Sequence, residues 1–141
     1  MILYLDTSVV VAALTSEART SDIQRWLSQQ PIDDLAISEW VVTEFSAALS
    51  IKMRERQIDP RRRTDALAAF ARLSTGSFEV LAVLGAHFRT AARFSENYVL
   101  GLRAADALHL AVAADHGAKL CTLDKRLEKA ATALGVKASL I

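Results

Sequence analysis

Residues 2–8 read Ile2-Leu3-Tyr4-Leu5-Asp6-Thr7-Ser8, and this short stretch gives the strongest indication of the fold class. Its first four residues are apolar without alternation, which is typical of a strand buried on both faces in a parallel sheet. Its last three are residues that end strands and cap helices, and the apolar run that follows predicts a helix to about Leu14. The chain therefore begins with a buried strand that leads directly into a helix.

The same alternation continues to the end of the chain. Pro31 ends a second helix, Ser38 is a favourable side-chain N-cap for a long helix, and Asp59-Pro60 supplies an N-cap and a first-turn proline. This pattern predicts an α/β fold, with a parallel sheet of four to five strands flanked by helices on both faces. The expected strands are 2–5, 35–37, 78–83, 119–122 and 136–140, and the expected helices are 7–14, 20–29, 39–57, 59–76, 86–97, 103–116 and 124–134.

The composition is that of one globular domain. Hydrophobic residues make up 52% and charged residues 23% of the 141 residues, so a disordered chain is excluded and residues 1–141 are predicted to form a single domain. A membrane helix needs about 18 uncharged apolar residues in a row, and no run in this chain approaches that length. One stretch near the N-terminus resembles a signal peptide, but Asp6 interrupts it. The single cysteine, Cys121, cannot form an internal disulfide. We therefore expect a protein of the cytoplasm.

The net charge is +1, so the overall balance does not indicate a nucleic-acid binder. The basic residues nevertheless form one cluster, on both sides of the turn at Asp59. The cluster could hold RNA phosphates, or it could be a solvated turn between two surface helices. Its members are Lys52, Arg54, Arg56, Arg61, Arg62 and Arg63.

Four acidic residues lie where a carboxylate is unexpected. Asp6 follows the first strand and Asp124 comes two residues after the fourth, at the edge of a parallel sheet where ligands bind. Glu44 lies on the apolar face of its helix, and Asp106 interrupts the apolar run 104–108. Converging carboxylates repel one another unless a divalent cation neutralises them. With no cysteine or histidine cluster nearby, these oxygen ligands favour Mg²⁺ or Mn²⁺, which can support phosphodiester hydrolysis.

Each acid also has a purely structural interpretation. Asp6 and Asp124 could simply cap the helices that follow them, since Asp is a favoured N-cap residue. Asp106 lies in the first turn of its helix, where the macrodipole favours a negative charge. Glu44 could pair with a basic residue of a neighbouring helix. The four acids together, in this order, favour a shared site.

The sequence around these acids resembles the PIN domain family and, more narrowly, the VapC toxins of bacterial toxin–antitoxin pairs. The resemblance spans the chain, and the Asp-Ala-Leu-His-Leu-Ala run is its most specific part. The segments that carry it are Leu5-Asp6-Thr7-Ser8, Thr43-Glu44-Phe45, Arg103-Ala104-Ala105-Asp106-Ala107-Leu108-His109-Leu110-Ala111 and Thr122-Leu123-Asp124.

This resemblance implies a parallel sheet covered by helices and a Mg²⁺- or Mn²⁺-dependent endoribonuclease. It also implies an acidic metal and catalytic site of Asp6, Glu44, Asp106 and Asp124, a homodimer, and inhibition by a cognate antitoxin. Hydroxyls at Thr7, Ser8 and Thr122 match positions where the family uses small polar residues to orient carboxylates or water, which is the usual role of groups around a metal site.

The remaining polar and aromatic residues are expected to be structural. His109 follows Asp106 by one helical turn and is interpreted as a packing or hydrogen-bonding residue. Trp26 and Trp40 are expected in the core or in a dimer interface, and Cys121 is expected to be a buried apolar residue.

Other functions of similar folds fit less well. A phosphatase of the haloacid dehalogenase type needs a second Asp where this chain has Ser8. A phospho-receiver module needs an acid after a middle strand, but Leu84 and Gly85 follow Val83. A PIN-like domain that only binds a partner, without cleaving RNA, stays open as the alternative.

Overall fold

The structure is a computed structural model that describes all residues from Met1 to Ile141. Its centre is a five-stranded sheet in the order β3-β2-β1-β4-β5, in which every pair of neighbours is parallel. The predicted parallel sheet is therefore confirmed, with the first strand in the middle. The strands are β1 Leu3–Leu5, β2 Leu35–Ser38, β3 Glu79–Leu81, β4 Lys119–Thr122 and β5 Ala138–Leu140.

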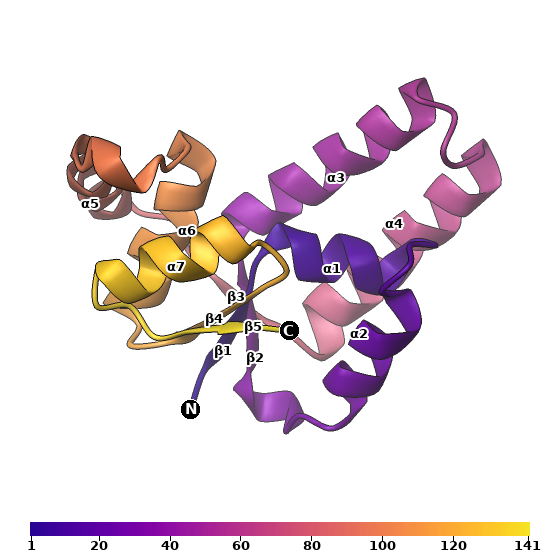
Figure 1. Cartoon of the computed structure of the whole chain (residues 1–141). Helices are drawn as coiled ribbons and strands as arrows, with labels where there is room; N and C mark the ends of the chain where they lie inside the picture. The colour runs from indigo at the N-terminus through magenta and orange to yellow at the C-terminus, as the bar shows by residue number, and fades with distance from the viewer.

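Seven helices flank the sheet, with α1 to α4 on the right and α5 to α7 on the left of Figure 1. The predicted α/β architecture is confirmed. Two short 3₁₀ helices, Ile32–Asp34 and Tyr98–Leu100, were not predicted. The α-helices are α1 Thr7–Leu14, α2 Thr20–Ser28, α3 Glu39–Arg54, α4 Pro60–Gly76, α5 Gly85–Glu96, α6 Ala104–Asp115 and α7 Lys125–Ala133.

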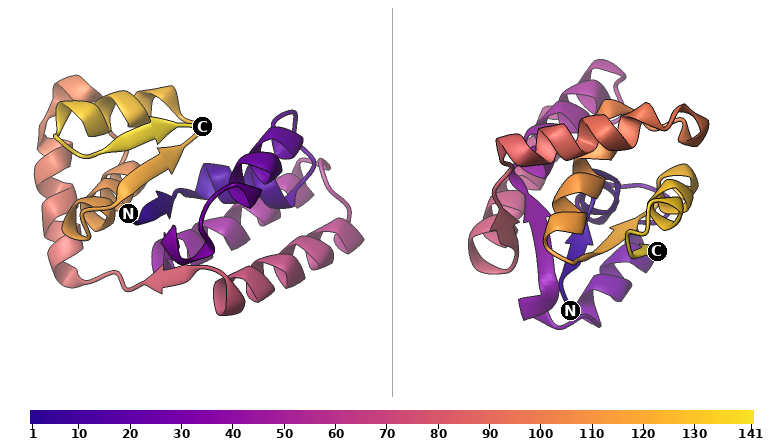
Figure 2. Two further views of the ribbon diagram at one scale, coloured as in Figure 1. Left: turned by 90° about the horizontal axis from the view of Figure 1, so that it is seen from below. Right: turned by 90° about the vertical axis from the view of Figure 1, so that its left-hand side faces the viewer.

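Helices α3 and α4 form a hairpin that projects beyond the sheet (Figure 1, Figure 2). The rings of Phe45 and Phe70 stack between them, with centroids 4.4 Å apart. Asp59 caps α4 as predicted, because its carboxylate accepts a hydrogen bond from the backbone of Arg62. Helix α3 is shorter than the predicted 39–57, since Arg56 adopts a left-handed backbone conformation (φ 56°) that ends it.

One predicted cap is wrong in its chemistry. Ser38 does occupy the N-cap position of α3, but its side chain makes no capping hydrogen bond. Its hydroxyl instead lies 2.7 Å from the hydroxyl of Tyr4, which reaches it from the neighbouring strand. Both side chains are fully buried, so this hydrogen bond gives each hydroxyl a partner in the core.

The core explains why the first helix is apolar around its whole circumference. Residues 9–13 of α1 are all buried, because α1 contacts β1 and β4 as well as α2, α3 and α4.

Cys121 is buried as predicted, and burial raises the pKa of its thiol to about 11. No helix is both long enough and apolar enough to cross a bilayer.

Candidate functional site

Four carboxylates come together beyond the carboxyl ends of the neighbouring strands β1 and β4. Asp6 directly follows β1, and Asp124 lies two residues beyond β4. Helix α3 contributes Glu44, and the first turn of α6 contributes Asp106. The charges of Asp124, Asp6 and Glu44 all act on Asp106, so the four predicted acids share one site.

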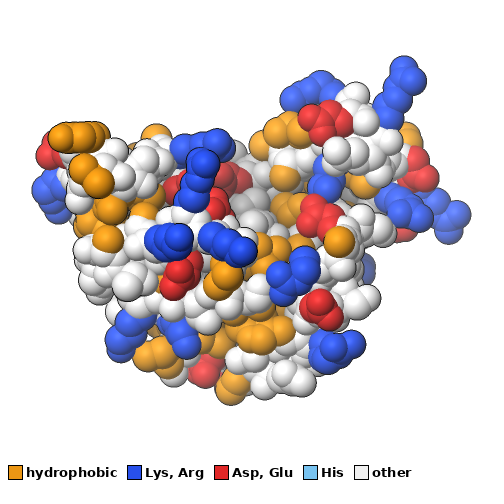
Figure 3. Space-filling view, viewed as in Figure 1, with side chains coloured by type: hydrophobic (Ala, Val, Ile, Leu, Met, Phe, Trp, Pro, Cys, Tyr) orange, Lys and Arg blue, Asp and Glu red, His pale blue; other side chains and the backbone are white.

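Figure 3 shows the setting of this edge of the sheet. Acidic side chains gather beside the hollow that separates the two groups of helices, and basic side chains border them. Asp6 and Asp124 are the N-caps of α1 and α7, and Asp106 lies in the first turn of α6. The positive ends of three helix dipoles therefore point at the carboxylates and stabilise their negative charge.

Asp6 is the most deeply buried of the four acids. Its side chain is 4% exposed and accepts hydrogen bonds on both carboxylate oxygens. Oδ1 accepts from the Ser8 hydroxyl and from the backbone N–H of Val9, whereas Oδ2 accepts from the Thr122 hydroxyl. Burial raises the pKa of Asp6 above its ordinary value, although these hydrogen bonds and the charge of His109 oppose the shift.

Glu44 is half-buried and has two donors on one oxygen. The Thr7 hydroxyl donates to Oε1 over 2.6 Å, and Nε2 of His109 lies 2.5 Å from the same oxygen. Burial alone would raise the pKa of Glu44, but the hydrogen bond and charge of His109 and the Thr7 hydroxyl hold it below its ordinary value. The second oxygen of Glu44 has no hydrogen-bond partner in the chain.

The pKa of Asp106 is shifted in the opposite direction from that of Glu44. No hydrogen bond stabilises its carboxylate. Burial raises its pKa; the charge of His109 opposes this, while the charges of Asp124, Asp6 and Glu44 raise it further. Neither oxygen is used by the fold, so both are free for a ligand.

Asp124 is exposed and uses one oxygen to cap α7. Its Oδ1 accepts from the backbone N–H groups of Arg126 and Leu127, at 2.8 and 3.3 Å. Thr122 links it to Asp6, because the Thr122 hydroxyl donates to Asp6 and accepts from the backbone N–H of Asp124. Ser8 makes a parallel link, since its hydroxyl donates to Asp6 and accepts from the backbone N–H of Leu123.

Three of the four acids share the same arrangement of hydrogen bonds on their two carboxylate oxygens. One oxygen each of Asp6, Glu44 and Asp124 accepts two protein donors. The second oxygen accepts one donor in Asp6 and none in Glu44 or Asp124. Because a carboxylate oxygen can accept about two hydrogen bonds, each second oxygen keeps capacity for a ligand. The three predicted supporting hydroxyls, those of Thr7, Ser8 and Thr122, all contact these carboxylates.

The predicted basic cluster lies elsewhere, around the tip of the α3–α4 hairpin (Figure 1). Lys52 lies two helical turns beyond Glu44, a distance of about 12 Å along α3. Its ammonium group pairs with Glu17 at 2.8 Å, and only 15% of its side chain is exposed. Arg62 donates to the Ser16 hydroxyl. Arg54, Arg56, Arg61 and Arg63 form no ion pair and stay exposed.

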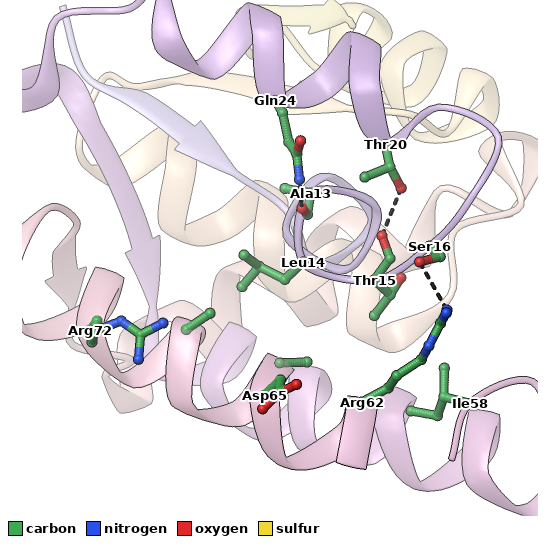
Figure 4. A pocket seen from close by; sticks show the side chains of 12 residues that line it. Ala13, Leu14, Thr15, Ser16, Thr20, Gln24, Ile58, Arg62, Asp65 and Arg72 are labelled. Carbon is green, nitrogen blue, oxygen red and sulfur yellow. Dashed lines mark hydrogen bonds between the residues drawn. The ribbon is translucent and has the colours of Figure 1, made fainter. Parts of the chain in front are cut away.

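Two other features of the surface are separate from the four acids. A pocket of about 460 Å³ lies between α4 and the α1–α2 segment, where Arg62 reaches Ser16 (Figure 4). His87, Asp115 and His116 bring three potential metal ligands together at the far end of α6. However, Nδ1 of His87 accepts the backbone N–H of Leu84, so Nε2 carries the proton that bonds to Asp115. That nitrogen is not free to bind a metal.

Sequence reasoning missed part of the network behind Glu44. His109 is a buried hydrogen-bonding residue as predicted, but its partners, Tyr4 and Glu44, were not. A tyrosine in an otherwise apolar buried strand was the available signal, because a buried phenol needs a hydrogen-bond partner. Trp26 packs against the main core and Trp40 against the α5–α6 core, as expected.

The fold and the site define an α/β protein with a carboxylate cluster at the carboxyl edge of a parallel sheet. The chain belongs to the PIN domain family, whose sequence model matches residues 3–133. The family predicted from the sequence is therefore confirmed. No curated protein matches the chain in sequence.

Several solved structures have a similar fold. FitAcB from Neisseria gonorrhoeae is 19% identical, with a TM-score of 0.73 over 97% of this chain and 96% of that chain. The toxin VapC20 from Mycobacterium tuberculosis, which cleaves the sarcin-ricin loop, is 22% identical, with a TM-score of 0.72 over 95% of each chain. VapBC-1 from nontypeable Haemophilus influenzae is 17% identical, with a TM-score of 0.71 over 99% of this chain and 98% of that chain.

Proposed function

We propose that this chain is a metal-dependent endoribonuclease that serves as the toxin of a type II toxin–antitoxin pair. Membership of the PIN domain family supports the nuclease activity. The VapC and VapBC structures that share its fold support the toxin role. In this proposal, residues 1–141 form one nuclease domain that acts in the cytoplasm.

The observation that carries this proposal is the set of carboxylate oxygens that accept one hydrogen bond or none from the protein. Oδ2 of Asp6, Oε2 of Glu44, Oδ2 of Asp124 and both oxygens of Asp106 keep capacity to bind a ligand. No lysine or arginine forms an ion pair with any of the four carboxylates, so their shared negative charge favours a divalent cation. Because all the donors are oxygens, Mg²⁺ or Mn²⁺ fits this site better than zinc.

Each residue has a distinct proposed role. Asp6, Glu44 and Asp106 bind the cation directly, and Asp124 acts with them, partly through water. The hydroxyls of Ser8 and Thr122 orient Asp6, and the hydroxyl of Thr7 orients Glu44. When bound, one or two Mg²⁺ or Mn²⁺ ions would activate a water molecule and stabilise the leaving oxygen of an RNA phosphodiester.

The exposed arginines at the tip of the α3–α4 hairpin are proposed to contact RNA phosphates away from the site of cleavage. Arg54, Arg56, Arg61 and Arg63 are available for this role. Lys52 and Arg62 contribute less, because the structure engages them with Glu17 and Ser16. Such contacts strengthen binding without selecting a sequence.

We also propose two protein partners. A cognate antitoxin would insert an arginine or lysine toward the four carboxylates and form charge-assisted hydrogen bonds there. A second copy of the chain would cover the apolar surface around Trp40 and Phe88, where Phe88 is 56% exposed and the buried indole N–H of Trp40 has no partner. Phe88→Ser should then convert a dimer into a monomer in light scattering.

Cleavage of purified RNA tests the nuclease proposal. The chain should cut RNA with Mg²⁺ or Mn²⁺ and should not cut it in EDTA. We expect 5′-phosphate and 3′-hydroxyl ends and no 2′,3′-cyclic phosphate, because in this proposal an activated water, and not the RNA 2′-hydroxyl, attacks the phosphorus. A PIN-like module that only binds a partner predicts no cleavage under any of these conditions. The toxin role is tested separately, by whether the product of a neighbouring short gene binds the chain and suppresses its toxicity.

A further inference from the structure

Three buried polar side chains form a continuous line that ends at Glu44. The hydroxyl of Ser38 lies 2.7 Å from that of Tyr4, and the Tyr4 hydroxyl lies 2.8 Å from Nδ1 of His109. Nε2 of His109 then lies 2.5 Å from Oε1 of Glu44. Ser38 and Tyr4 are fully buried and His109 is 3% exposed. The line thus connects β2, β1 and α6 to a side chain on α3.

The hydrogen-bonding capacity of these groups fixes where the protons point. A carboxylate oxygen can only accept a hydrogen bond, so Nε2 of His109 carries the proton and donates it to Oε1 of Glu44. Both ring nitrogens of His109 are then engaged within the protein, one with Glu44 and the other with Tyr4. His109 therefore has no free nitrogen, and it is too deeply buried to contact a substrate.

The two donors on Glu44 act on the same oxygen. Thr7 and His109 both bond to Oε1, which leaves Oε2 without a partner. A glutamate side chain has three rotatable bonds, and no other hydrogen bond in the chain holds this carboxylate. Removal of the His109 hydrogen bond would leave it held by the Thr7 hydroxyl alone.

We propose that His109, held in place by Tyr4 and Ser38, is a positioning residue that presents Oε2 of Glu44 to a divalent cation. This inference rests on the proposed function, because it requires a cation at the four carboxylates. It assigns His109 a role through Glu44 and not in proton transfer to or from RNA. Groups that orient metal ligands commonly change metal affinity about 10- to 100-fold when they are removed.

Calorimetric titration of the metal-free chain with Mn²⁺ tests the proposal without measuring RNA cleavage. His109→Leu should weaken Mn²⁺ binding by about tenfold or more, whereas His109→Gln should keep most of the affinity because its amide N–H can still donate to Glu44. Tyr4→Phe, which preserves the ring and removes only the hydroxyl, should weaken binding by a smaller factor.

A second pair of variants separates positioning from general damage to the fold. In a Glu44→Gln background, His109→Leu should cause no further loss of Mn²⁺ affinity, because the carboxylate it orients is already absent. His87→Leu is the matched control, since His87 is also 3% exposed and bonded to a carboxylate, at the other end of α6. It should lower the melting temperature without changing Mn²⁺ affinity.

Two results would overturn the proposal. Unchanged Mn²⁺ affinity in His109→Leu would show that Glu44 does not depend on His109. An equal loss of affinity with and without Glu44→Gln would show that His109 acts through the fold and not through Glu44. If the unchanged chain binds no Mn²⁺, the proposed metal-dependent function fails, and this inference fails with it.

Discussion

Asp6 and Asp124 show how one side chain can serve both the fold and a site. Each caps a helix through Oδ1, as the structural interpretation of the sequence predicts. Each also keeps capacity on Oδ2, which the cap does not use. A cap and a ligand are therefore compatible in the same residue, because a carboxylate has two oxygens and a helix N-terminus occupies only one of them.

Asp106 should destabilise the metal-free fold at neutral pH. A carboxyl whose pKa is higher in the folded protein than in the unfolded chain costs stability when ionised, and this cost disappears as the pH falls through the folded pKa. Asp106→Asn should therefore raise the melting temperature in EDTA at about pH 7.5, and the gain should vanish below about pH 4. Thermal unfolding of both chains across this pH range is the measurement. A gain that persists at the acidic end of the range would contradict the electrostatic explanation.

Asp124→Asn should retain part of the RNA cleavage that Asp106→Asn loses. Asp124 is exposed and its Oδ1 is committed to α7, whereas both oxygens of Asp106 are free. Asparagine can still cap α7 through its side-chain oxygen, so the fold should be preserved. Cleavage rates of the two variants at equal Mn²⁺ concentration compare these roles. Equal inactivation of both would contradict the peripheral role of Asp124.

Among individual residues, the sequence predicts the acids better than the groups that support them. Glu44 and Asp106 are conspicuous because carboxylates interrupt apolar positions of helices. Ser38 and Tyr4 are not, since a serine before a helix has an ordinary explanation as a cap and a tyrosine suits any strand. Their hydrogen bond depends on the pairing of β1 with β2, which no local pattern contains.

Among the elements, helix α3 is followed by a strained residue. Arg56 has φ 56°, a conformation that costs an L-residue with a side chain about 1 kcal/mol relative to glycine. Arg56→Gly should therefore stabilise the fold by about 1 kcal/mol in chemical denaturation. Arg54→Gly, two residues earlier in a helical conformation, is the control and should destabilise by a similar amount. A loss of stability in Arg56→Gly would contradict this explanation of the helix end.

The arginines of the α3–α4 hairpin give a prediction on RNA binding. Replacement of Arg54, Arg61 and Arg63 with glutamine should weaken binding similarly for unrelated RNA sequences. The slope of log K against log salt concentration should also fall, by about 0.7 for each phosphate that is no longer neutralised. Binding should be measured in EDTA, so that cleavage does not interfere. An unchanged slope would show that these arginines do not contact RNA phosphates, and it would favour the alternative that they lie in a solvated turn between two surface helices.

The regular elements were predicted well because their apolar patterns are local. Strands 2–5 and 119–122 and the glycine-terminated helices α6 and α7 follow from period and capping, and Gly117 and Gly135 adopt the expected positive φ. The edge strands β3 and β5 are shorter than predicted. Each pairs with one neighbour only, β3 with three residues of β2 and β5 with three residues of β4. The two 3₁₀ helices carry no such pattern.

In the molecule as a whole, the strand order creates the site. β1 and β4 are separated by more than a hundred residues, yet they are neighbours in the sheet, and this places Asp6 and Thr122 in contact. A net charge of +1 does not indicate this arrangement, because the acids gather at the sheet edge and the exposed arginines at the hairpin tip. The alternation of strands and helices predicts that acids after parallel strands share an edge, but not which strands are neighbours.

Asp6→Asn is the decisive variant for the proposal that the four carboxylates form a metal-dependent nuclease site. Asparagine keeps the shape of Asp6 and its capping oxygen but removes one negative charge from a cation site. RNA cleavage with Mn²⁺ and the melting temperature in EDTA should be measured for both chains. We predict that cleavage falls to the level of the unchanged chain in EDTA, while the melting temperature is equal or higher, since burial already disfavours the ionised form of Asp6. Full cleavage by the variant, or equal cleavage by the unchanged chain with and without EDTA, would refute the four-carboxylate site.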